Sequence, residues 1–118
     1  MKRTTIIIFA FILQSCFNYS GNSLSFIVKN KSNSKLDSIT VGISKENQTY
    51  IRNLAIGQKV NKEIIFNNVK GDGDYFLEIY HKEKIIQSKR FGYFTNGKPL
   101  NSSFEISIFK DTTLITPH

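Results

Sequence analysis

The sequence has one cysteine, Cys16, two histidines, two prolines and no tryptophan. One thiol cannot form an internal disulfide, so the hydrophobic core alone must hold the fold, which is feasible for 118 residues. A zinc site needs three or four Cys, His or carboxylate ligands, and His81 and His118 are the only histidines. We therefore expect no metal site, no catalytic residues and no cofactor, and we interpret His81 as a solvated strand residue. A Ser–His–Asp arrangement stays open, although the chain has no Gly-x-Ser-x-Gly elbow.

Long hydrophobic runs are also missing. The longest, from Ile6 to Leu13, has eight residues, whereas a helix that crosses a bilayer needs about 20. Lys2 and Arg3 precede this run. A short apolar run behind two cations is typical of a secretory signal peptide.

The end of the run is its most specific part. Leu13-Gln14-Ser15-Cys16 resembles the lipobox of bacterial lipoproteins. The resemblance implies cleavage between Ser15 and Cys16 and attachment of diacylglycerol and fatty chains, such as palmitate, to Cys16. The alternative is an ordinary signal peptide followed by an incidental cysteine. We divide the chain into a signal peptide over 1–15, a lipidated cysteine and polar tether over 16–23, and a domain over 24–115.

This leader predicts a location in the cell envelope. Two or three acyl chains hold a protein on a membrane stably, whereas one chain does so only marginally. No acidic cluster follows Cys16, and such clusters direct some of these lipoproteins to the cell exterior. We expect a lipid anchor in the inner or outer membrane, with the domain on the periplasmic side.

The charge is basic, with 16 Lys and Arg against 9 Asp and Glu, a formal net charge of +7. A basic surface attracts nucleic acid or anionic lipid. The lysines are scattered along the chain, which is also typical of an ordinary soluble surface. Because an exported protein rarely meets nucleic acid, we expect no nucleic-acid partner.

From Leu24 onward, apolar and polar residues alternate with the period of a β-strand, and no convincing helical stripe occurs. About seven short strands separated by turn residues indicate an all-β fold, an antiparallel immunoglobulin- or fibronectin-like β-sandwich. The turns are expected at Asn30–Lys35, Lys82–Lys84 and Thr95–Pro99. The expected strands have apolar faces at Leu24–Val28, Ile39–Ile43, Tyr50–Ile56, Val60–Phe66, Tyr75–Ile79, Ile85–Tyr93 and Phe104–Ile108.

Three segments carry the fold resemblance. Val28–Ser32 with Leu36–Ile39 resembles the first two strands of immunoglobulin-like domains of secreted bacterial proteins, and Leu54–Gln58 resembles the turn before their middle strands. The mature chain is similar to small lipoproteins of Bacteroidetes, with Phe91–Gly97 as a shared segment. The resemblance implies a fold and an envelope location, and no activity. With no Cys…Trp…Cys core, an antibody-type domain is excluded.

The predicted hairpin Tyr75–Phe94 combines cations with aromatic residues, which can bind anionic lipid head groups or glycans. Alternation places Lys89, Phe91 and Tyr93 on one face and Arg90 and Phe94 on the other, which favours core aromatics beside solvated lysines over a single binding patch. Tyr80 and Phe94, together with Phe109, are expected to be exposed, on the faces opposite the core. The predicted binding surface consists of Tyr80, Lys84, Lys89, Arg90 and Phe94.

Short motifs allow further interpretations. Gly71-Asp72-Gly73-Asp74 superficially resembles a calcium loop, but two aspartates alone are too few ligands, and we predict a turn. Asp37-Ser38-Ile39 and Asp111-Thr112-Thr113 resemble the O-glycosylation motif of Bacteroidetes envelope proteins.

Three functions follow as hypotheses. The first is a non-enzymatic, membrane-anchored module that binds an envelope protein. The second is a module that binds a glycan or a lipid head group. The third is a periplasmic immunity or inhibitor protein.

Overall fold

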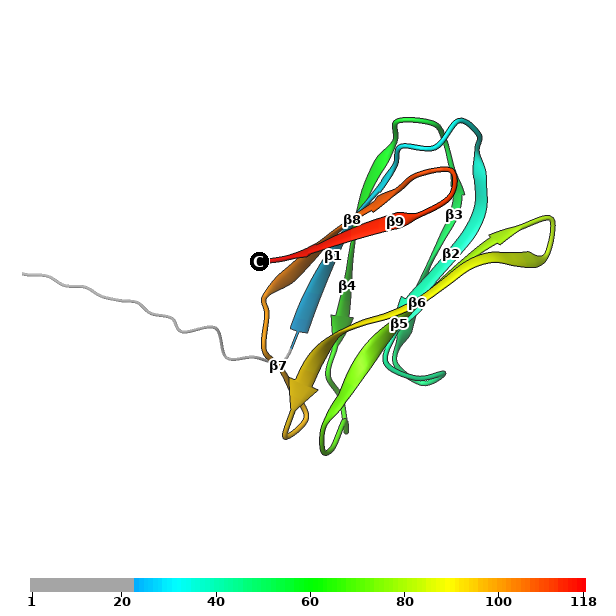
Figure 1. The fold of residues 1–118 in the computed structure, drawn as a ribbon. Coiled ribbons are helices and arrows are strands. Elements are labelled where there is room, and N and C mark those ends of the chain that lie inside the picture. The colour runs from blue at the N-terminus through cyan, green and yellow to red at the C-terminus, as the bar shows by residue number, and fades with distance from the viewer. Residues whose placement is uncertain (1–22) are drawn as a thin grey trace, which may run out of the picture.

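The computed structural model describes residues 23–118, which form two β-sheets packed face to face (Figure 1). The signal peptide, the cleavage site and Cys16 lie outside these residues. The described part is all-β and contains nine strands: β1 (Ser23–Asn30), β2 (Leu36–Gly42), β3 (Gln48–Leu54), β4 (Lys59–Ile65), β5 (Gly73–His81), β6 (Lys84–Thr95), β7 (Lys98–Pro99), β8 (Ser103–Ile108) and β9 (Thr113–Pro117).

The strands divide into a four-stranded sheet in the order β4-β1-β8-β9 and a five-stranded sheet in the order β3-β2-β5-β6-β7. The paired strands are antiparallel except β1 and β8, which run parallel. The prediction of about seven strands missed β7 and β9. β7 has only two residues, and β9 carries no regular apolar alternation and ends in proline, so neither gives a period-2 signal.

The core follows the predicted alternation. In β1 every second residue is buried, and the inward faces of β2, β5 and β8 are buried as well. Burial of each large apolar side chain contributes about 1.5–3 kcal/mol, which drives the two sheets together. The buried apolar residues are Leu24, Phe26, Val28, Leu36, Ile39, Val41, Ile51, Leu54, Ile64, Phe66, Tyr75, Leu77, Ile79, Phe94, Phe104, Ile106 and Ile108.

Aromatic rings fill one part of this core around the fully buried Tyr75. Its ring centroid lies 5.6 Å from those of Phe91 and Phe104 and 5.8 Å from that of Phe94. Phe26 lies 6.1 Å away with its ring nearly perpendicular to that of Tyr75. Edge-on and offset contacts are geometries that aromatic pairs prefer, so these rings stabilise the core beyond the burial of their area.

Two tight turns confirm sequence predictions. Asn96 and Gly97 have φ of 52° and 70°, and Thr95 pairs with Lys98, so they form the two-residue turn between β6 and β7. The turn between β5 and β6 uses Lys82 and Glu83, with φ of 51° and 66°. Lys84, which was predicted to lie in that turn, is already the first residue of β6.

Phe94 contradicts the prediction that it is exposed, because it is only 4% exposed. Gly73 pairs with Phe94 and Tyr75 pairs with Phe91, so β6 holds one residue more than β5 between these pairs. This β-bulge contains Gly92, whose φ is +66°. The extra residue reverses the alternation, and both Phe91 and Phe94 turn inward.

Candidate functional site

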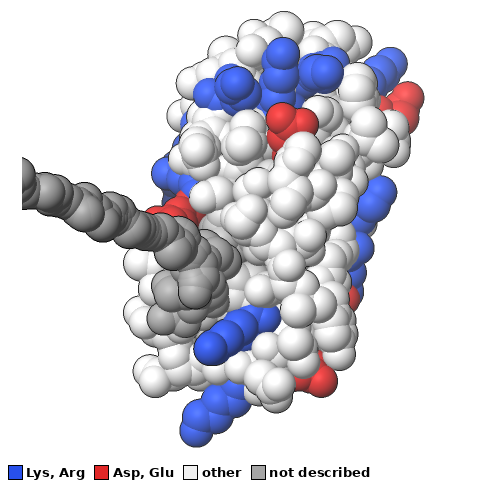
Figure 2. Space-filling view, turned by 90° about the vertical axis from the view of Figure 1, so that its left-hand side faces the viewer, with Lys and Arg blue, Asp and Glu red and all other residues white. Residues whose placement is uncertain are grey.

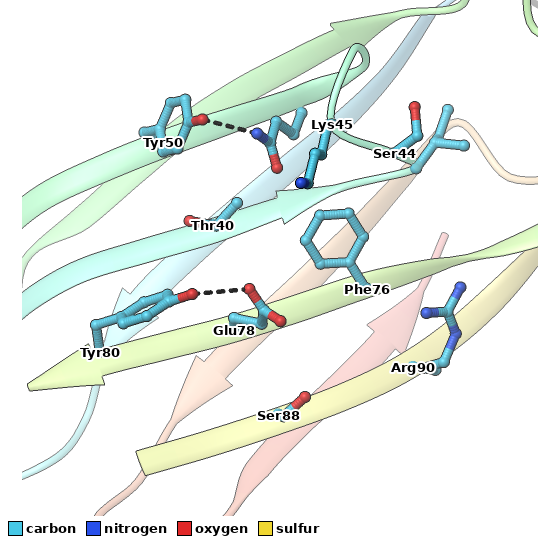
Figure 3. Close-up of a pocket in the computed structure, with 11 residues that line it drawn as sticks. Thr40, Ser44, Lys45, Tyr50, Phe76, Glu78, Tyr80, Ser88 and Arg90 are labelled. Atoms are coloured by element: carbon cyan, nitrogen blue, oxygen red, sulfur yellow. Dashed lines mark hydrogen bonds between the residues drawn. The ribbon is translucent and has the colours of Figure 1, made fainter. Parts of the chain in front are cut away.

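The outer face of the five-stranded sheet carries a row of polar and aromatic side chains. Thr40 of β2 pairs with Tyr50 of β3 on one side and with Glu78 of β5 on the other, and Glu78 pairs with Ser88 of β6. Side chains that alternate with the buried set point away from the core, so these four residues cross four strands on the outer face. Figure 3 shows this row together with Phe76 and Tyr80.

A groove of about 630 Å³ lies over this row (Figure 3). Its aromatic members are Tyr50, Phe76 and Tyr80. Tyr50 is 47% exposed, and Phe76 and Tyr80 are half-buried. The complete lining is Thr40, Ile43, Ser44, Lys45, Gln48, Tyr50, Phe76, Glu78, Tyr80, Ser88 and Arg90.

Hydrogen bonds hold both tyrosines of the groove. The Tyr80 hydroxyl donates to Glu78 Oε1 at 3.0 Å, and Gln48 Nε2 donates to the Tyr50 hydroxyl at 2.7 Å. The hydrogen bond to Glu78, with a smaller effect from burial, raises the pKa of Tyr80 above its usual value. The guanidinium of Arg52 lies 5.7 Å from the centre of the Tyr50 ring, within the range of a cation–π contact. Neighbouring side chains thus hold the hydroxyls of Tyr50 and Tyr80 in place, while both rings keep part of their surface open to the groove.

Arg90 lines the groove and forms a forked ion pair with Asp74. Its Nε donates to both carboxylate oxygens at 3.1 and 3.0 Å, and its Nη2 donates to Oδ1 at 2.6 Å. The hydrogen bonds from Arg90 lower the pKa of Asp74, and Asp74 in turn raises that of Arg90. Asp74 compensates this guanidinium, whereas Lys45, the other cation of the groove lining, forms no ion pair with a carboxylate of the described residues.

The structure brings only part of the predicted binding surface together. Tyr80 and Arg90 line the groove, whereas Lys84 lies beside the hairpin turn, opposite His81. Lys89 pairs with the buried Leu77, so its side chain leaves β6 on the side that faces the other sheet. Its Nζ donates a hydrogen bond to Thr113 O of β9 at 3.1 Å. Phe94 belongs to the core. The five residues therefore do not form one surface, because alternation and the bulge send them in different directions.

Sequence reasoning missed nine of the eleven groove residues, among them Thr40, Tyr50, Phe76 and Glu78. These four come from strands far apart in the sequence, and only the strand order brings them into one row. A signal existed, because Tyr50 and Phe76 are aromatic residues at positions that alternate with the apolar face. The sequence does not show that β2 lies between β3 and β5.

The predicted turn at Gly71–Asp74 is confirmed only in part, because Gly71 and Asp72 precede β5 whereas Gly73 and Asp74 are its first two residues. Asp72 Oδ1 accepts hydrogen bonds from Thr95 Oγ1 at 2.9 Å and from the Asn96 amide at 3.0 Å, so it braces the turn between β6 and β7. The Asn96 bond is the main cause of a lowered pKa for Asp72. Among residues 23–118, no three His, Cys, Asp or Glu side chains come together to hold a metal ion.

The residues of the two glycosylation-like motifs differ in exposure. Ser38 lies within β2 and is half-buried, and the neighbouring Asp37 accepts a hydrogen bond from the Lys82 amide at 2.6 Å. That bond is the main cause of a lowered pKa for Asp37. Thr112 is exposed between β8 and β9. His81 Nδ1 lies 3.6 Å from Asp37 Oδ2.

The basic residues form a separate feature on the other sheet. Lys29, Lys31 and Lys59 surround a hollow of about 180 Å³ beside Glu105. Lys29 and Lys59 are direct partners on β1 and β4. Figure 2 views the molecule from its left-hand side in Figure 1, and Lys and Arg gather toward one end of that face. Three lysines against one glutamate give this hollow a net positive charge, which attracts anions.

An apolar groove of about 390 Å³ lies where β6 approaches β8 and β9. Tyr93 and Leu114 line it and are 48% and 60% exposed. Gln87 and Thr113 close the same side of the sandwich, since Thr113 Oγ1 donates to Gln87 Oε1 at 2.6 Å. The part of the chain from residue 23 onward contains no helix that is long and apolar enough to cross a membrane.

Comparisons with known proteins give little beyond this geometry. No family model matches the chain, and no curated protein matches it. Among solved structures, it is similar to the NMR structure of a protein from Eubacterium rectale, with 5% sequence identity and a TM-score of 0.49. That match covers 81% of this chain and 88% of the other chain. The function is therefore argued from the residues themselves.

Proposed function

We propose that this protein is a lipid-anchored, non-enzymatic binding module of a bacterial cell envelope that recognises another envelope component. The observation that carries the proposal is the outer face of the five-stranded sheet. Within the described residues no strand packs over that face, and a groove lined by Tyr50, Phe76 and Tyr80 lies open on it. Tyrosine and arginine are among the residue types that dominate binding energy at recognition surfaces.

The anchor is supported by the leader sequence. Two cations, a short apolar run and Leu13-Gln14-Ser15-Cys16 together predict processing at Cys16 and lipidation of its thiol. Six residues separate Cys16 from Ser23, the first residue of β1, and this stretch spans at most about 25 Å when extended. The tether would keep the domain close to the bilayer and raise its local concentration there, so a weak binding site is sufficient.

We also propose the immunoglobulin-like type of sandwich. The strand order β3-β2-β5-β6 beside the β1–β4 pair supports it, because immunoglobulin domains combine a C′-C-F-G sheet with a paired B and E strand. The parallel β8 beside β1 and the additional β9 depart from that pattern. Kinship with the small lipoproteins of Bacteroidetes is part of the same proposal.

The hydrogen bonds that Glu78 and Asp74 already accept favour binding over catalysis. Glu78 accepts a hydrogen bond from Tyr80, and Asp74 is held by Arg90. A general base must be free to take a proton from its substrate, and these contacts compete with that role.

The proposal is tested by capture from detergent-solubilised envelopes with the tagged full-length protein, its Tyr50→Ala and Tyr80→Ala variants, and a Tyr93→Ala control. Tyr93 matches Tyr50 in exposure but lines the other groove. We expect one reproducible protein or glycan with the wild type and the control, and its loss with the two groove variants. Capture that is indifferent to both groove substitutions, or no capture at all, would contradict the proposal.

A further inference from the structure

The chemistry of the groove narrows the class of its ligand. We infer that the groove binds an oligosaccharide of uncharged pyranose sugars, with Tyr50 and Tyr80 packing against sugar rings and Glu78 accepting hydrogen bonds from sugar hydroxyls. The inference rests on the proposed function, because it names the ligand of the same face.

The two tyrosines are placed to contact neighbouring sugars. Tyr50 on β3 pairs with Thr40 of β2, and Tyr80 on β5 pairs with Ser38 of β2, so their backbones are two strand spacings and two residues, about 12 Å, apart. Figure 3 shows both rings beside the same groove, one on each side of Thr40. A pyranose has an apolar face of C–H groups that packs against an aromatic ring, and a tyrosine offers that ring with its hydroxyl in water.

Hydrogen-bonding groups line the groove beside the rings. Thr40, Glu78 and Ser88 follow one another across β2, β5 and β6. An ionised carboxylate accepts about four hydrogen bonds, and Glu78 receives one from Tyr80 through Oε1. The capacity left on Glu78 suits two adjacent sugar hydroxyls, which are donors that a hydrocarbon or an aliphatic protein surface does not provide.

The charges favour uncharged sugars over acidic ones. Glu78 stands in the middle of the row, where it repels a carboxylated or phosphorylated sugar. The lining holds two cations, Arg90, which Asp74 already compensates, and Lys45, whose single positive charge is balanced in number by Glu78, so the groove has no excess of positive charge to attract an acidic sugar. A polyanion would instead find the Lys29, Lys31 and Lys59 cluster on the four-stranded sheet.

The exposed aliphatic residues argue against a protein ligand at this groove. A protein interface has an apolar core, with a polar rim around it. The exposed large aliphatic residues of the described chain all lie outside the groove lining. They are Ile56, Ile65, Ile85, Ile86, Leu100 and Leu114.

The test is saturation-transfer NMR with the full-length protein in a sugar-free zwitterionic detergent. The probes are cellohexaose, mannohexaose and chitohexaose, with a heparin hexasaccharide as the charged comparison. We expect at least one uncharged probe to bind. Tyr50→Ala and Tyr80→Ala should each weaken that binding by roughly tenfold or more, whereas Tyr93→Ala leaves it unchanged.

A second variant separates recognition from folding. Tyr80→Phe keeps the ring and loses only the hydroxyl that contacts Glu78. We expect it to retain more binding than Tyr80→Ala, with the circular dichroism spectrum of the wild type.

Two results would overturn the inference. One is that no uncharged probe binds, or that only the heparin fragment binds. The other is binding that does not respond to Tyr50→Ala and Tyr80→Ala. If the envelope capture still depends on both tyrosines in either case, the binding module stands and only its ligand class is wrong. If neither the binding of an uncharged probe nor the envelope capture depends on the two tyrosines, the proposed function is wrong as well.

Discussion

Asn30, at the end of β1, is fully buried, and the nitrogen and the oxygen of its side-chain amide each form two hydrogen bonds. Its Nδ2 donates to Ser34 O and Leu54 O, both at 2.9 Å. Its Oδ1 accepts from the amide and the hydroxyl of Ser32, at 2.9 and 2.6 Å. One side chain thus ties β1, the loop after it and the end of β3 together. The turn predicted at Asn30–Lys35 was wrong for Asn30, which is the last residue of β1, and nothing in the sequence indicated that this asparagine is buried.

Replacing Asn30 with alanine would leave these backbone groups without their partner. We expect Asn30→Ala to lower the free energy of unfolding by about 2–3 kcal/mol, because an unsatisfied buried polar group costs its full desolvation penalty. Urea denaturation measures the change as a lower midpoint with an unchanged slope. Asn61→Ala, at an exposed position of β4, is the control and should change stability by no more than about 0.5 kcal/mol. Equal effects of the two substitutions would contradict this role of Asn30.

Asp72 links stability to pH. The amide of Asn96 and the hydroxyl of Thr95 lower its pKa in the folded protein below the ordinary value of 3.8. The unfolded chain therefore takes up this proton first as the pH falls. The stabilising contribution of Asp72 is complete above pH 3.8 and is lost as the pH falls through the lowered folded pKa.

The comparison of wild type with Asp72→Ala tests this linkage. We expect the wild type to be the more stable protein at pH 7, with the difference shrinking as the pH drops below 3.8. Thermal denaturation followed by circular dichroism across this range measures it. A difference that stays constant down to the lowest pH would show that the carboxylate charge is not involved.

At the scale of elements, the alternation of apolar and polar residues predicted the buried face of regular strands and failed for a strand with bulges. The buried faces of β1, β5 and β8 match the predicted ones, because a strand with one face in the core needs an apolar residue at every second position. β6 has an extra residue at the Gly92 bulge and another at Ile86. A bulge leaves no period in the sequence, so the position of Phe94 was predicted on the wrong face.

Gly92 lets β6 make this bulge. Its φ is +66°, and a Cβ at this position would lie 2.7 Å from ring atoms of Tyr75 and Phe104. We expect Gly92→Ala to lower stability by roughly 2–4 kcal/mol, the sum of backbone strain and overpacking.

Gly57→Ala provides the matched control for the bulge. Gly57 has φ of +80°, but a Cβ there would meet no atom within 4 Å. Its alanine variant should lose only about 1 kcal/mol, from backbone strain alone. The difference between the urea midpoints of the two variants isolates the contact with the Tyr75 and Phe104 rings. Equal losses of stability would mean that these rings move aside at no cost in free energy.

At the scale of the whole molecule, the sequence predicted a sheet-built domain, and the two packed sheets confirm it. It did not predict the groove, because Tyr50, Glu78 and Arg90 become neighbours only through the order β3-β2-β5-β6. The predicted binding surface contained two of the groove residues, Tyr80 and Arg90. Residues that share a binding face across strands have no fixed sequence spacing, so composition and periodicity are not enough to identify them.

Attachment of this domain to a bilayer is tested most directly by the intact mass of the protein recovered from bacterial membranes. We predict a chain that begins at Cys16 and is heavier than its polypeptide by a diacylglycerol and an acyl chain. In a Cys16→Ala variant we predict no added mass and no cleavage at that site. A wild-type protein found in the aqueous fraction, with a free thiol or with a different first residue, would contradict the anchor and the envelope binding built on it.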